Sequence, residues 1–127
     1  MNYGITKTIE LSYEQAIEKV TEELKKEGFG VLTTIDVKET LKKKLDVDFR
    51  KYIILGACNP PFAYEALKAE EQIGLLLPCN FIIYEKEGKT VVSAFNPSTI
   101  SAISNNAKLN EISAKLNEKI FKVLDSI

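Results

Sequence analysis

Hydrophobic and polar positions change period several times along the chain, and each change predicts a new element. Residues 3–10 predict an opening strand, and Ser12 with Gln15 forms the pattern of a capping box that starts a helix. Apolar residues then recur in steps of three and four until Gly28, which is placed to end the helix. Residues 29–37 are rich in β-branched side chains and predict a second strand.

The middle of the chain predicts a short helix, a buried strand and a further helix. Residues 38–49 form the short helix, whose cluster Lys42–Lys44 is either a solvated face or an anion-binding patch. Residues 51–58 are almost wholly apolar, which predicts a central strand buried on both faces. Pro61 suits the first turn of the next helix, which we expect to end before Gly74.

The last third of the chain predicts a hairpin followed by a long helix. Residues 80–86 and 90–95 are the hairpin strands, and residues 96–106 are a loop or short helical connector. From Leu109 to Ile127, apolar residues step by threes and fours, so this helix packs across the sheet or against a partner. The order β-α-β-short α-β-α-β-β-α over residues 1–127 predicts one α+β domain, a mainly antiparallel sheet with helices packed on one face.

The composition excludes several classes of function but does not identify the function. The net charge is −1 and Arg50 is the only arginine, so we expect neither nucleic acid nor membrane as a partner. The chain has no histidine, which excludes Ser-His-Asp and Cys-His catalysis within it and histidine-ligated metal or haem. Without a signal-peptide pattern we expect a cytoplasmic protein with free thiols, and no cofactor is predicted.

Two Cys-Asn pairs are the most distinctive chemical feature of the sequence. Cys58-Asn59 ends the buried strand just before a helix, and Cys79-Asn80 begins the first hairpin strand. If both strands belong to one sheet, their ends meet at its rim and the pairs share a pocket. Pro60 would hold the turn rigid there. The candidate ligand-binding residues, which include Tyr64 one turn into the helix, are Cys58, Asn59, Pro60, Tyr64, Cys79 and Asn80.

Other interpretations of the same residues stay open. Both cysteines can be small buried apolar groups and both asparagines turn formers, and Tyr64 can fill core space. Cys58, at a helix N-terminus, can also be the thiolate of a redox or sulfur-transfer enzyme. Two thiolates are too few for a structural zinc, although a dimer could assemble four. A structural protomer without a ligand is a further alternative.

Several segments together resemble one protein family. "TTIDVKETLKKKL", "YIILGACNP", "ALKAEEQIGLLLPCN" and "FNP" span residues 33–97 and are similar to the family called domain of unknown function 302. The resemblance implies a curved antiparallel sheet of the TATA-binding-protein-like fold, and homodimers, but no established activity. Likeness to a DNA-binding fold does not predict DNA binding. The matching motif residues are Gly56, Cys58, Asn59, Pro60, Leu77, Pro78, Cys79 and Asn80.

These observations lead to a hypothesis about binding rather than a reaction. We expect a homodimeric small-molecule-binding module whose ligand is small and anionic or thiol-reactive. Asn59 and Asn80 would supply amide hydrogen bonds, and Cys58 and Cys79 would supply soft, polarizable groups. Whether the protein is an enzyme stays open at this point.

Overall fold

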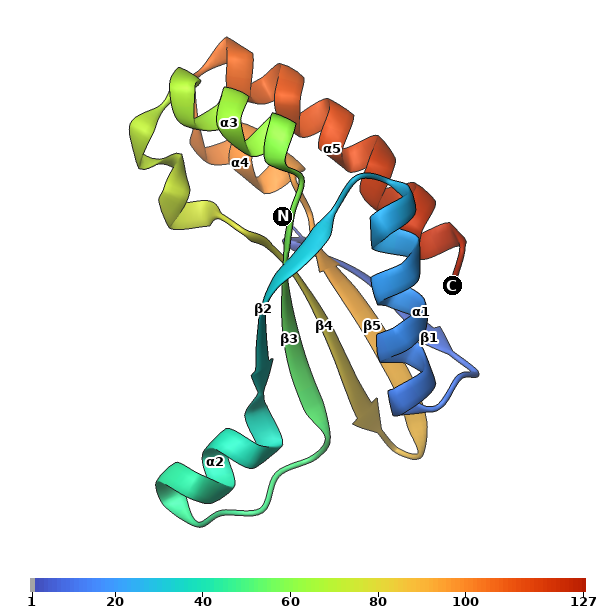
Figure 1. Ribbon diagram of the computed structural model, residues 1–127. Coiled ribbons are helices and arrows are strands. Elements are labelled where there is room, and N and C mark those ends of the chain that lie inside the picture. The colour runs from blue at the N-terminus through green and yellow to red at the C-terminus, as the bar shows by residue number, and fades with distance from the viewer. Residues whose placement is uncertain (1) are drawn as a thin grey trace.

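The structure is a computed structural model that describes residues 2–127, and its centre is one antiparallel sheet (Figure 1). The five strands lie in the order β1 (Gly4–Ile9), β5 (Lys89–Phe95), β4 (Cys79–Lys86), β3 (Tyr52–Cys58) and β2 (Gly30–Asp36). Every neighbouring pair is antiparallel, and β4 and β5 form the hairpin that the sequence predicts. The α+β class and the antiparallel sheet are therefore confirmed.

The helices divide into a large group over the sheet and one that stands apart. The first group is α1 (Tyr13–Lys26), α3 (Pro60–Ala69), the 3₁₀ helix η1 (Glu71–Leu76), α4 (Ser98–Ile103) and α5 (Ala107–Asp125). The other helix, α2 (Val37–Leu45), lies at the opposite end of the sheet from α3 and α4 (Figure 1).

The ends of the first helix follow the local signals in the sequence. The Gln15 backbone N–H donates to Ser12 Oγ over 3.1 Å, and the Ser12 N–H donates to Gln15 Oε1 over 3.2 Å, which completes the capping box. Gly28 has a φ of +85°, the left-handed conformation that a glycine adopts without strain. The chain can therefore turn sharply from α1 into β2.

The core lies between the sheet and the helices of the first group. Leu55, Phe81, Ile83 and Val92 come from the three central strands, face the same side and are at most 2% exposed. The apolar stripe of α5 packs into the same core, as its three- and four-residue spacing predicts. Lys7 of β1 fastens the end of this helix, because its Nζ donates to the backbone carbonyls of Leu124 and Ile127.

Three local predictions need correction. β3 is fully buried on one face only: on the other face Gly56 is buried but Tyr52 and Ile54 are partly exposed, because the core helices pack on the opposite side. The short helix begins at Val37, where the side chain of Asp36 accepts the Glu39 N–H over 3.0 Å and so ends the preceding strand. The helix that begins at Pro60 ends at Ala69, because the extended backbone that follows separates it from η1.

No helix among residues 2–127 is both long enough and apolar enough to cross a bilayer.

Candidate functional site

A cavity of about 290 Å³ lies beneath α3, between that helix, α5 and the ends of β3 and β4. Cys58, Asn59 and Cys79 all line it, although they come from two segments twenty residues apart. Leu32 and Leu67 also line it and are 67% and 45% exposed, so the cavity has a rim that solvent reaches. The structure therefore brings both predicted thiols to one shared opening.

The sheet register places the two cysteines at the same end of neighbouring strands. Cys79 is the direct partner of Ala57 across the β3–β4 pair, and Cys58 follows Ala57 at the end of β3. Gly56 permits this arrangement, since a Cβ atom there would lie 2.8 Å from Pro78 Cγ and would also overlap Thr33 Oγ1. The glycine and the proline of the two motifs thus touch across the strands and hold the cysteines at the cavity.

Asn59 links the cavity to the start of the sheet. Its side chain is 7% exposed, and its Nδ2 donates to the backbone carbonyl of Glu27 over 3.2 Å. This bond joins the first turn of α3 to the end of α1, next to Gly28. The Asn59 amide is therefore used at least in part to position α3 over the cavity.

The remaining predicted site residues lie outside the cavity walls. Tyr64 is 63% exposed on α3 and lies beneath Lys68, whose Nζ is 4.5 Å from the ring centroid. Asn80 is exposed, and in the alternating strand it points to the opposite side from Cys79. Pro60 is exposed at the first position of α3, where its ring fixes the helix start. Direct contacts to a ligand in this cavity would therefore come from other side chains.

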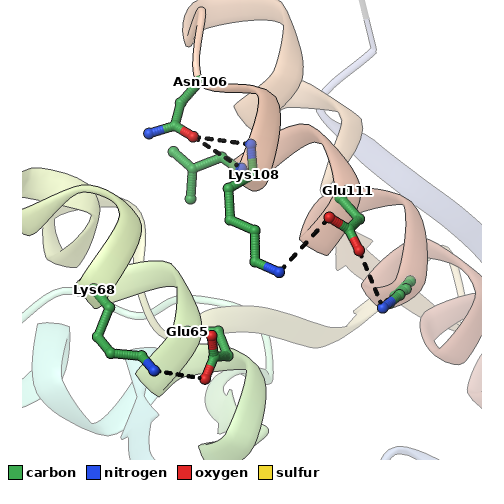
Figure 2. A network of polar contacts seen from close by, with 7 residues as sticks. Glu65, Lys68, Asn106, Lys108 and Glu111 are labelled. Atoms are coloured by element: carbon green, nitrogen blue, oxygen red, sulfur yellow. Dashed lines mark hydrogen bonds and ion pairs between the residues drawn. The ribbon is translucent and has the colours of Figure 1, made fainter.

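Polar contacts lie within α3 and within the first turns of α5 (Figure 2), and one hydrogen bond joins the two helices. Asn106 caps α5, because its Oδ1 accepts the backbone N–H groups of Lys108 and Leu109. Its Nδ2 donates to the carbonyl of Ala69 over 3.0 Å, which joins the end of α3 to the start of α5. The Lys68 ammonium, 2.9 Å from Glu65, is the main cause of the lowered pKa of that carboxyl group. These charged groups lie on the outer surface rather than on the cavity lining.

The interior of the cavity is apolar and carries no charged side chain among the described residues that line it. Burial, and to a smaller extent the neighbouring Cys58, raises the pKa of the Cys79 thiol to about 11. Cys79 is therefore a neutral thiol at physiological pH. Within the part of the chain that the structure describes, no group of three histidine, cysteine or acidic side chains is arranged to hold a metal ion.

Sequence reasoning missed one polar residue that the structure places on the cavity. Ser113 of α5 is 2% exposed, lines the cavity, and its Oγ has no hydrogen-bond partner. The only signal in the sequence was a serine next to Ile112 on the apolar stripe of the last helix. Such a serine is common in helices, so the pattern alone gave no reason to select it.

The lysine cluster of α2 is a solvated surface. Lys42 lies 3.0 Å from Asp46, and Lys43 lies 2.8 Å from Glu39. The lysine side chains in these pairs are more than half exposed. The acidic neighbours offset much of the positive charge that an anion would need.

Comparison with known proteins identifies the family but no activity. The family model for the domain of unknown function DUF302 matches residues 5–127. A similar solved structure is the crystal structure of an uncharacterized conserved DUF302 protein from Bacillus stearothermophilus, which is 32% identical with a TM-score of 0.90. The match covers 98% of this chain and 97% of the other. A search among curated proteins finds no match. With a family match over nearly its whole length, the chain belongs to the DUF302 family.

Proposed function

We propose that the protein is a homodimeric binding module that takes a small, mainly apolar molecule into the cavity beneath α3. The observation that carries the proposal is the shared cavity itself, which both cysteines and Asn59 line and whose rim is exposed. Ligand pockets in proteins are concave, mostly apolar and supplied with a few polar groups. We expect the protein to act in the cytoplasm, where its two thiols stay reduced.

The lining favours an uncharged ligand over the anionic one expected from sequence. Transfer of an anion from water into an apolar cavity is unfavourable unless a cation or several N–H groups receive it. The described residues on the cavity include no lysine or arginine, and the two prolines at the start of α3 lack N–H groups. A thiol-reactive ligand remains compatible with the site, because Cys58 is half-buried and lines it.

A thiolate enzyme that uses Cys58 is the alternative. Cys79 is protonated at neutral pH, so a second thiolate beside Cys58 is not available to such an enzyme. Replacement of both cysteines by alanine separates the alternatives. A binding module should retain its affinity for an apolar probe within about tenfold, since soft wall contacts contribute little individually. An enzyme would lose all turnover.

Binding of the neutral fluorescent probe N-phenyl-1-naphthylamine tests the cavity directly. We expect saturable fluorescence enhancement with the unmodified protein, and its loss in Ala66→Phe, because Ala66 is 5% exposed and lines the cavity. Ala114→Phe on the exposed side of α5 is the matched control and should bind normally. If Ala66→Phe does not fold, Ala63→Leu places a smaller obstruction on the same wall. Equal probe binding by all folded variants would contradict the proposal.

The dimer is proposed from the surface around α2. We define the α2 arm as residues 35–49. Four of its apolar residues, Ile35, Leu45, Val47 and Phe49, are 38–65% exposed, and within α2, which the structure describes in full, no side chain is buried. A nine-residue helix is marginal in water without burial against another element. The neighbouring β2 is an edge strand, which adds unpaired backbone groups to the same surface.

A second copy of the chain is the partner that suits this surface. The rim of the α2 arm carries Lys38, Lys42, Lys43 and Lys44 beside Glu39, Asp46 and Asp48. In a two-fold symmetric dimer, the same surface of each copy forms the interface. A rim that carries both positive and negative side chains can therefore be complementary to the same rim of the second copy.

Sedimentation velocity over a range of concentrations tests the dimer. We expect Leu45→Glu to weaken association at least tenfold, because it places a charge in the apolar centre of the interface. Leu75→Glu is the control, since Leu75 is 83% exposed on η1, outside the α2 arm. A protein that stays monomeric at every concentration would refute the dimer and leave the cavity proposal intact.

A further inference from the structure

Ser113 differs from two other hydroxyl groups on or beside the helices of this protein. Thr21 Oγ1 donates to the carbonyl of Ile17, and Ser126 Oγ donates to that of Lys122, each over 2.8 Å. This bond to the preceding turn is the ordinary way in which a helical hydroxyl is satisfied. Ser113 Oγ makes no such bond and is buried. A buried hydroxyl without a partner destabilises the free protein.

The position of Ser113 indicates what could satisfy it. Buried side-chain atoms without a partner in the described chain are Ser113 Oγ, Thr99 Oγ1 and Asn117 Oδ1, and of these residues only Ser113 lines the cavity. Leu109, Ile112 and Leu116 flank it on the same helix and line the same space. The hydroxyl is therefore an isolated hydrogen-bonding group in a hydrocarbon wall.

We propose that the cavity selects a compact, uncharged ligand with a hydrocarbon body and one hydroxyl or carbonyl oxygen, which pairs with Ser113 Oγ. This inference rests on the proposed function and specifies its ligand class. A hydroxyl can donate to a carbonyl or accept from an alcohol, so both oxygens suit Ser113. A volume of about 290 Å³ is at the lower end for ligand pockets and fits a molecule of two or three rings.

The contribution of this hydrogen bond can be measured by comparing two ligands, one with and one without an oxygen, on the unmodified protein and on the Ser113→Ala variant. The dissociation constants of 1-naphthol and 1-methylnaphthalene, which have similar shapes, are measured by displacement of N-phenyl-1-naphthylamine. We expect Ser113→Ala to reduce the preference for 1-naphthol over 1-methylnaphthalene about three- to tenfold, the size of one neutral hydrogen bond. Thr99→Ala removes another buried unpaired hydroxyl, away from the cavity, and should leave the preference unchanged.

Thermal unfolding supplies a second readout that does not depend on a ligand. Ser113→Ala should keep or raise the unfolding temperature of the free protein, because it removes an unsatisfied buried hydroxyl. A clear fall would mean that the protein already satisfies Ser113, and would overturn the inference.

The binding outcomes separate the two proposals. If both naphthalene compounds bind and Ser113→Ala leaves their ratio unchanged, the inference about Ser113 is wrong while the cavity proposal stands. If N-phenyl-1-naphthylamine itself does not bind the unmodified protein, the proposed function fails and the inference fails with it. If the probe binds but neither compound displaces it, the ligand class is wrong.

Discussion

The two ends of the molecule use helices in opposite ways. At the cavity end, α5 has 19 residues, seven of which are buried, and its stability comes from the core. At the other end, α2 has nine residues, all described, with none buried. It is held by the Asp36 cap and by ion pairs on its surface, and it ends at Asp46. A helix cap contributes roughly 0.5–2 kcal/mol and solvent screens the exposed ion pairs, so these contacts stabilise α2 far less than a buried apolar face would.

The largest predicted contrast between the two ends is the cost of shortening a leucine. Leu109→Ala on α5 should lower the free energy of unfolding by about 2–5 kcal/mol, because this side chain is 1% exposed in the core. Leu45→Ala on α2 should change it by less than about 0.5 kcal/mol, because that side chain is 65% exposed. Urea unfolding of the monomer, at low protein concentration, measures both. Equal losses would show that the α2 arm belongs to the same cooperative core.

Alkaline pH should destabilise the cavity end through Cys79. The pKa of this thiol is raised from 9.0 to about 11, so above pH 9 the unfolded chain loses the proton while the folded protein keeps it. The unfolded state then binds fewer protons, and stability falls as the pH rises from about 9 to 11, by on the order of 2 kcal/mol.

Comparison with Cys79→Ala isolates that contribution. The difference in unfolding free energy between this variant and the unmodified protein should change with pH across the same window, whereas titration of lysines and tyrosines affects both proteins. A constant difference from pH 8 to pH 11 would show that Cys79 is not shielded from solvent. The experiment thus tests the burial on which the neutral-thiol interpretation depends.

Features that arise within one helix or strand could be predicted from the sequence, whereas features that depend on how the elements pack could not. Local signals placed α1 and α5 well, because the capping box at Ser12 and the apolar stripe from Leu109 act within one helix. The position of Cys58 and Cys79 at one end of the sheet could also be predicted, since each stands at the end of a strand and the two strands are antiparallel neighbours. The outward orientation of Tyr64 depends on the rotation of α3 over the cavity, which no local pattern determines.

Ser113 and β3 show a second limit. That Ser113 is buried without a hydrogen-bond partner can be recognised only from the three-dimensional arrangement of α5 and the other residues that line the cavity. The apolar run of β3 suggested helices on both faces, but periodicity does not report whether a sheet face is covered within the chain. The half-exposed Tyr52 and Ile54 are therefore a property of tertiary arrangement.

The smallest predicted effect concerns the Asp36 cap and decides whether α2 opens on its own. Asp36→Ala removes the acceptor of the Glu39 N–H and should destabilise α2 by about 0.5–2 kcal/mol. Because no residue of the helix is buried within the described chain, this loss should appear as faster amide hydrogen exchange in residues 37–45, with exchange in α5 unchanged.

The matched control is Ser12→Ala, which removes a similar cap from α1, a helix with five buried residues. That loss should lower global stability and speed exchange in the most protected core amides instead. If Asp36→Ala accelerated exchange throughout the sheet, α2 would be coupled to the core and the contrast between the two ends would be wrong.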